Sequence, residues 1–192
     1  MCKELQIMEA KREATVDDLR RVRGKAELVN GELVLMSPAG ALHGYAGGAI
    51  HASLTDYARR TRRGHALPDN VGFIIDLPHR RSFCPDVAYC LERLGPDFIQ
   101  GAPVFAVEVR SKEDYGPAAE RAMAAKRADY FAAGTLVVWD VEVLREGWVR
   151  VFRASAPEQP ATYGRGATAE AEPALPGWRF AVDELFPPED TT

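Results

Sequence analysis

The sequence is poor in cysteine and contains no long hydrophobic run. Its 192 residues include 3 cysteines, an odd and sparse set that argues against a disulfide framework and favours a reducing compartment. No stretch reaches the roughly 18 consecutive apolar residues that a membrane span requires. The opening stretch, MCKELQIMEAKREAT, lacks the apolar centre of a signal peptide. We therefore expect a cytoplasmic protein with no membrane segment.

Internal repeats and a linker between domains are also missing. The length lies within the range of about 100–200 residues that is usual for one domain. Such a chain can bury roughly 70% of the surface that it exposes when unfolded, so folding needs no metal or disulfide. We expect residues 1–192 to form a single domain.

The formal net charge is only -4, but the charge is unevenly distributed. The first 81 residues carry a net charge of +3 and the remainder -7, so overall acidity does not exclude a nucleic-acid substrate. The basic residues form two clusters. These are Arg59, Arg60, Arg62, Arg63 with His65, and His79 with Arg80 and Arg81. We predict that the arginines contact nucleic acid; the alternative is that both clusters are solvated loop charges.

The first half of the chain predicts a helix, a hairpin and a longer helix. Thr15 followed by Asp18 resembles a capping box and starts a short helix. The runs 26–29 and 32–36 flank Asn30-Gly31, the strongest signal for a two-residue hairpin turn. Apolar residues from 42 to 57 then recur at the spacing of an amphipathic helix that ends near Gly64.

The second half alternates strands and one helix. Strands are expected over 71–77, 86–91, 104–109, 136–139 and 148–152, a helix over 117–132, loops joining short strands over 154–177, and a terminal turn over 182–186. The helix connects the strands 104–109 and 136–139, a crossover that favours a parallel pair. The expected fold class is therefore mixed α/β (α+β), with a mixed central sheet flanked by helices.

Two carboxylates on expected neighbouring strands are the main candidates for chemistry. Asp86 begins one strand, and Glu108 ends the apolar run from Val104 to Val107. A buried carboxylate needs a cation, because an unpaired buried charge costs several kcal/mol. Such a pair offers the hard oxygen ligands that Mg²⁺ or Mn²⁺ prefers, and a bound ion would activate water toward a phosphodiester.

A cation for Glu108 is present in the helix over 117–132. Lys126 lies among the apolar residues of one helix stripe, so it could point toward Glu108. This pair could also be purely structural. Arg110 stays protonated at any usable pH and can bind a phosphate, but it cannot act as a base.

Two further residues are weaker candidates. Glu32 is in phase with Val34 on the second hairpin strand, and His43 lies one position off the apolar stripe of the long helix. Taken alone, Glu32 is more often an exposed strand residue and His43 a partly exposed polar one. Asp86 could likewise be an ordinary turn residue after a proline.

At this point the residues resemble a known family. Pro85-Asp86 and Glu108-Val109-Arg110 look like the metal-binding signature of the PD-(D/E)XK nuclease superfamily. More closely, an ordered set of segments is similar to a restriction-endonuclease family long described as a domain of unknown function. The set comprises residues 31–38, His43, 85–88, 107–111, Lys126 with Tyr130, 133–134, 138–139 and 175–177.

The resemblance implies a restriction-endonuclease-like fold with a core over about 15–186. Carried over by position, Asp86 and Glu108 would be ligands of Mg²⁺ or Mn²⁺, and Glu32 an additional catalytic acid from the N-terminal part. Lys126 would replace the superfamily's lysine, whose usual position holds Arg110. His43 matches a family position, with a phosphate or water contact as its expected role.

The sequence thus predicts a metal-dependent endonuclease-like hydrolase acting on DNA. A homodimer is expected, because the superfamily commonly cleaves two strands with two sites. One alternative is a catalytically inactive module of the same fold that binds nucleic acid or protein. Another is a metal-dependent hydrolase with a different substrate, since fold does not determine function.

Overall fold

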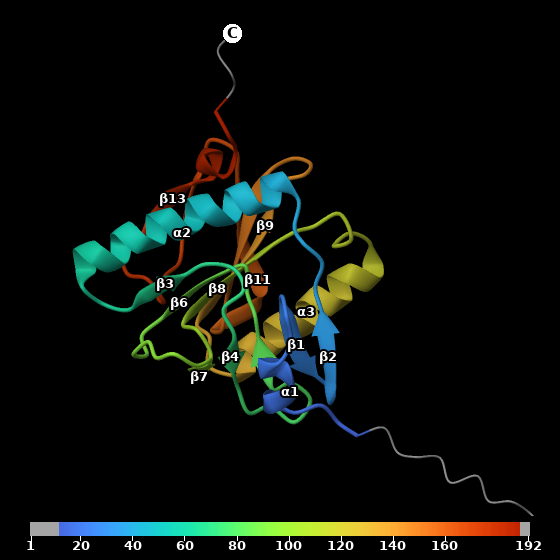
Figure 1. Ribbon diagram of the computed structural model, residues 1–192. Coiled ribbons are helices and arrows are strands. Elements are labelled where there is room, and N and C mark those ends of the chain that lie inside the picture. The colour runs from blue at the N-terminus through green and yellow to red at the C-terminus, as the bar shows by residue number, and fades with distance from the viewer. Residues whose placement is uncertain (1–11, 189–192) are drawn as a thin grey trace, which may run out of the picture.

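The computed structural model describes residues 12–188 and is built around a mixed β-sheet (Figure 1). The six strands of this sheet follow the order β11-β10-β9-β8-β6-β3. β8 and β9 are parallel, and every other neighbouring pair is antiparallel. The helical elements are α1 (Val16–Arg20), α2 (Ala41–Thr61), α3 (Pro117–Ala132) and the 3-10 helix η1 (Val182–Leu185). The strands are β1 (Ala26–Val29), β2 (Glu32–Leu35), β3 (His65–Leu67), β4 (Phe73–Ile74), β5 (Ser82–Phe83), β6 (Val87–Cys90), β7 (Ile99–Gln100), β8 (Phe105–Val109), β9 (Val137–Glu142), β10 (Trp148–Arg153), β11 (Ala156–Gly164), β12 (Thr168–Glu170) and β13 (Arg179–Ala181).

The central strands are buried because a long helix covers each of the two faces of the sheet. Val87 of β6 packs on the same side as Ile50 of α2, whereas the next residue, Ala88, packs with Tyr130 of α3. Figure 1 shows α2 crossing one face of the sheet and α3 lying on the other. Successive residues of β6 thus face opposite sides of the sheet, and the expected mixed α/β class is confirmed. Among the described helices, none combines the length and apolar character that crossing a membrane would need.

Local sequence signals define the elements that precede the site. Thr15 and Asp18 form a complete capping box at α1. Asn30 and Gly31 both have positive φ, 50° and 70°, as a type I′ turn requires, and they join β1 to β2 in the predicted register. The parallel pairing of β8 with β9 across α3 is also confirmed.

Two predicted segments differ from the structure. The strand expected over 71–77 is reduced to β4, because the chain turns back through hydrogen bonds from Ile75 to Arg81 and from Leu77 to Arg80. The region 154–177 was expected to form loops, but it contains the nine-residue strand β11. Pairing with β10 stabilises β11 despite its two prolines, which edge strands tolerate.

Candidate active site

A cavity of about 1210 Å³ opens where the hairpin, the start of α2 and the ends of β6 and β8 meet. Four of the five predicted catalytic residues line it, namely His43, Asp86, Glu108 and Lys126. Lys25 also lines the cavity and was not predicted. Sheet order explains the meeting of Asp86 and Glu108, because β6 and β8 are adjacent and antiparallel, with Val87 opposite Val107.

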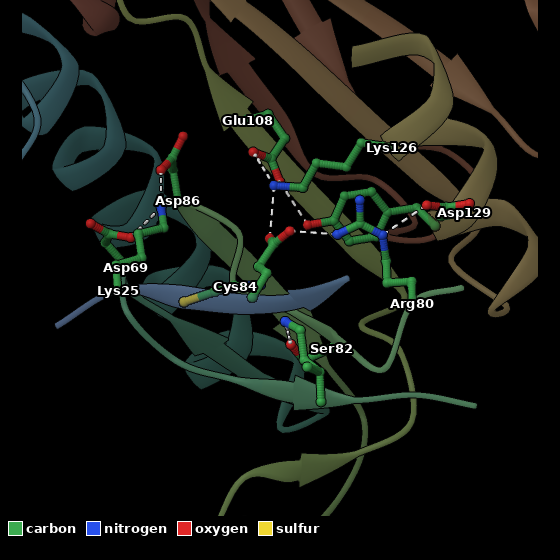
Figure 2. A network of polar contacts seen from close by, with 12 residues as sticks. Lys25, Asp69, Arg80, Ser82, Cys84, Asp86, Glu108, Lys126 and Asp129 are labelled. Atoms are coloured by element: carbon green, nitrogen blue, oxygen red, sulfur yellow. Dashed lines mark hydrogen bonds and ion pairs between the residues drawn. The ribbon is translucent and has the colours of Figure 1, made fainter. Parts of the chain in front are cut away.

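Asp86 is fixed by backbone and side-chain donors. The Val109 backbone N–H donates to Oδ2 at 2.7 Å, and His43 Nε2 lies 3.2 Å from the same oxygen. Lys25 Nζ lies 2.5 Å from Oδ1 and also bonds Asp69 at 2.7 Å, as Figure 2 shows. Burial opposes ionisation of Asp86, but the His43 hydrogen bond and the Lys25 charge hold its pKa well below the usual range.

Glu108 forms the predicted contact with Lys126. Lys126 Nζ lies 2.9 Å from the Glu108 carboxylate (Figure 2). The Tyr130 hydroxyl donates to Glu108 Oε1 at 2.6 Å. Burial raises the pKa of Glu108, and although Lys126 opposes this, the negative charge of Asp86 reinforces it. The carboxylates of Asp86 and Glu108 thus repel each other, and a cation that bound both would relieve this repulsion.

Glu27, which was not predicted, contacts Lys126 behind the cavity wall. Glu27 is 3% exposed, and its Oε1 accepts from the Cys84 backbone N–H and lies 2.9 Å from Lys126 Nζ. Burial opposes ionisation of Glu27, but Lys126 and Arg80 lower its pKa. Glu32 is exposed on β2, opposite Val29 in the hairpin register, and it does not line the cavity. Glu27 is therefore the acidic residue of β1 that contacts Lys126, and the role expected for Glu32 stays a prediction.

Arg80 belongs to the internal support of the site rather than to a free surface. The residue is buried. Its Nη1 donates to Glu27 Oε2 at 2.5 Å, and its Nε donates to Asp129 Oδ2 at 2.7 Å. Asp129 is also contacted by His79 at 2.7 Å. Carboxylates thus engage Nε and Nη1 of Arg80, and the contact with nucleic acid expected for this residue stays a prediction.

Arg110 is also removed from solvent. It is 3% exposed and donates from Nε and Nη2 to Asp140 at 2.8 Å, while Glu120 accepts from Nη1 and Nη2. Burial opposes the charge of Arg110, but Asp140 and Glu120 raise its pKa. Two carboxylates thus engage all three nitrogens of the Arg110 guanidinium, and the contact with nucleic acid expected for this residue stays a prediction.

The first basic cluster does not meet the cavity. Arg59, Arg60, Arg62 and Arg63 are exposed at the C-terminal end of α2, whereas His43 lies in its first turn. His43 and Arg59 are 16 residues apart in α2, a separation of about 24 Å along the helix axis. Arg81 is exposed as well and pairs with Asp76 at 2.7 Å. These arginines remain candidates only for contacts remote from the carboxylates.

The donor set at the cavity suits a hard divalent cation that keeps part of its water shell. Within residues 12–188, no group of three or more His, Cys, Asp or Glu side chains is arranged to hold a metal. Mg²⁺, however, is typically held by one or two carboxylates together with several waters. Asp86 and Glu108 provide two such carboxylates on adjacent strands, so the residues present fit the ion.

The sequence matches one known protein family over most of its length. The sequence model of the Uma2 family, described as "Putative restriction endonuclease", matches residues 15–183. The chain belongs to the Uma2 family. This confirms the family resemblance that the sequence predicted, over nearly the same residues. No curated protein sequence matches the chain.

A solved structure supports the fold assignment. The chain is similar to the crystal structure of a putative nuclease belonging to DUF820 from Anabaena variabilis, with a TM-score of 0.69 and 15% sequence identity. The similarity covers 90% of this chain and 97% of that chain. At this identity the likeness bears on the fold alone, and the predicted restriction-endonuclease-like fold of this Uma2 member is confirmed.

Proposed function

We propose that this Uma2 protein is a metal-dependent endonuclease that hydrolyses phosphodiester bonds of DNA. The observation that carries the proposal is the convergence of Asp86 and Glu108 from adjacent strands beside Lys126, at the wall of one large cavity. Family membership supports nuclease chemistry. Carboxylate pairs with a nearby lysine suit phosphoryl chemistry, in which electrostatic stabilisation is the main contribution.

Asp86 and Glu108 would hold Mg²⁺ or Mn²⁺. When bound, such an ion polarises the scissile phosphate and lowers the pKa of a water ligand. His43 and the Val109 N–H fix the orientation of Asp86, and Tyr130 fixes that of Glu108. Hydrogen bonds of this kind to ligand carboxylates commonly matter for metal affinity and activity.

Lys126 is the cation best placed to act on the reacting phosphate. Glu27 and Glu108 both lie 2.9 Å from its Nζ, which keeps the ammonium at the cavity wall. Burial disfavours the charged form, but these two carboxylates raise the pKa of Lys126. Lys126 therefore stays protonated at neutral pH and can stabilise negative charge that develops on the phosphate or orient a water.

A plasmid-nicking assay tests the proposal. Wild type, Asp86→Ala and the control Asp76→Ala, which removes an exposed aspartate outside the cavity, are incubated with Mg²⁺, with Mn²⁺ and with chelator. We expect nicking with metal by wild type and Asp76→Ala only. Calorimetric titration with Mn²⁺ gives a readout independent of turnover, and undetectable Mn²⁺ binding by wild type would overturn the proposal.

A binding module without catalysis is the second candidate. It is favoured by one observation, the presence of buried Arg110 where the superfamily has a lysine. In that case Asp86→Ala and Lys126→Ala would bind DNA as tightly as wild type does, and neither wild type nor the variants would nick the plasmid. Salt-sensitive DNA retention without cleavage would establish this second function.

A further inference from the structure

Most cationic side chains at the cavity wall already have carboxylate partners. Lys25 is bonded to Asp86, and Lys126 to Glu108. Arg80 and Arg110 each donate to two carboxylates. Lys25, Arg80 and Arg110 thus balance buried acids of the site, and Lys126 is the cation already proposed to act on the reacting phosphate.

Arg127 differs from them. It follows Lys126 in α3, lines the same cavity, and its side chain is 15% exposed. Within the described part of the chain, its Nη1 is buried and makes no hydrogen bond. The nearest carboxylate oxygen, Asp140 Oδ2, lies 3.7 Å from Nη1, which is too long for a hydrogen bond. The guanidinium therefore retains unused donors.

The surroundings of Arg127 explain why Asp140 leaves it unsatisfied. Both oxygens of Asp140 already accept from Arg110 at 2.8 Å. The Arg127 guanidinium also lies over the ring of Phe152, 4.0 Å from its centroid, a stacking that leaves the edge of the guanidinium for another partner. Burial lowers the pKa of Arg127, so an additional anion would stabilise the charged form.

The position of Arg127 relative to Glu108 gives this unused donor a role. Asp140 is the register partner of Glu108 in the parallel pair β8–β9, and neighbouring strands are about 4.8 Å apart. Arg127 therefore lies beside Asp140, on the strand next to the one that carries the carboxylate proposed to hold the metal. A guanidinium at this place can form two parallel hydrogen bonds to phosphate oxygens.

We propose that Arg127 binds a non-bridging oxygen of a phosphate in the DNA strand, next to the phosphate that is cleaved. The inference rests on the proposed function and identifies a substrate contact within the same cavity. It also accounts for a buried donor that the fold leaves without a partner. Such a group costs stability, and a turn of the partly exposed side chain toward the cavity would pair it with a bound phosphate.

The test measures binding of a fluorescent DNA duplex by anisotropy, in chelator to prevent cleavage and over a series of salt concentrations. The variants are Arg127→Met, Arg127→Lys and the control Arg121→Met, which removes an exposed arginine of α3 that does not line the cavity. Loss of one phosphate contact should lower the slope of log K against log[salt] by about 0.9.

We expect Arg127→Met to bind about tenfold more weakly with the reduced slope, and to melt at the same or a higher temperature than wild type. Arg127→Lys should keep the slope but bind more weakly, because lysine lacks the two-pronged geometry. Arg121→Met should match wild type. This combination of weaker binding with unreduced stability would not arise from a structural role.

Three results would overturn the inference. If Arg127→Met binds as Arg121→Met does, Arg127 makes no substrate contact. If Arg127→Met is strongly destabilised and Arg127→Lys binds with wild-type affinity, the residue is structural. If wild type shows no salt-sensitive DNA binding, the inference and the DNA substrate both fail, whereas the first two results leave metal-dependent nicking by wild type intact.

Discussion

Glu108 and Asp140 lie opposite each other in the β8–β9 register, on one face of the sheet, yet they are paired with different cations. Lys126 neutralises Glu108 at 2.9 Å, and Arg110 neutralises Asp140 at 2.8 Å. Two adjacent carboxylates tolerate burial because each has its own counter-charge. Glu108 is a proposed metal ligand whereas Asp140 is not, so the two pairs should respond differently to substitution.

Glu108→Gln should remove activity while preserving the fold. The change deletes a negative charge near Asp86 and Glu27, and the amide can still accept from Tyr130, while Lys126 keeps Glu27 as its partner. Plasmid nicking should fall at least about a hundredfold, and the melting temperature should stay at or above that of wild type. A variant that unfolds would show instead that the Glu108–Lys126 pair is mainly structural.

Arg110→Lys should destabilise the protein without improving cleavage. Lysine keeps the positive charge but cannot reproduce the two hydrogen bonds of Arg110 to Asp140. The free energy of unfolding should fall by about 2 kcal/mol, the usual contribution of a charge-assisted hydrogen bond, as measured by urea denaturation. Faster nicking by this variant would contradict a purely structural role for Arg110. It would indicate that a lysine at position 110 takes part in catalysis, as in the wider superfamily.

Glu27→Gln should slow nicking, whereas Glu32→Gln should not. Glu27 holds Lys126 and Arg80, so its neutralisation loosens Lys126 without touching Asp86. We expect a ten- to hundredfold lower rate with retained Mn²⁺ affinity in calorimetry. Equal rates for the two variants would mean that Glu27 does not position Lys126, and a loss confined to Glu32→Gln would favour the position expected from sequence.

Glu142 should make stability fall in acid. Burial opposes its ionisation, but the Gly147 N–H and the Tyr115 hydroxyl, at 3.1 and 2.8 Å, lower its pKa below the ordinary 4.5. A lowered folded-state pKa gives stability that is fully present above the unfolded value and lost as pH falls through the folded value.

The measurement compares urea midpoints of wild type and Glu142→Gln from pH 7 to pH 3. Wild type should be more stable at pH 7, and the difference should shrink on acidification below about pH 4.3. A difference that stays constant over this range would show that the Glu142 carboxylate contributes no pH-dependent stability.

Local signals predicted much of the fold and one contact of the candidate site, that of Glu108 with Lys126. The hairpin was predictable because Asn30-Gly31 fixes the turn by backbone conformation alone. The Glu108–Lys126 contact was predictable because a charged residue ending an apolar strand needs a cation, and the following helix offered one in phase. In the first case the signal lies within one two-residue turn, and in the second it lies within β8 and the helix that follows it.

Glu27 and Arg80 could not be assigned in this way. β1 is buried at Ala26, Glu27 and Leu28 alike, so the alternation that distinguishes inside from outside gives no signal there. Arg80 belongs to a basic run that looks solvated in sequence, and its partners Glu27 and Asp129 lie about 50 residues away in either direction. Sequence gives the charge of a side chain but not the distant carboxylate that neutralises it.

The length of α2 sets a minimum footprint for any duplex that contacts both ends of this helix. His43 and Arg59 are about 24 Å apart along the axis, and each base pair advances a strand by about 3.4 Å. A DNA segment that reaches from the carboxylates to the exposed arginines must therefore extend at least about seven base pairs beyond the cleavage position. Shorter duplexes would be held by the cavity alone.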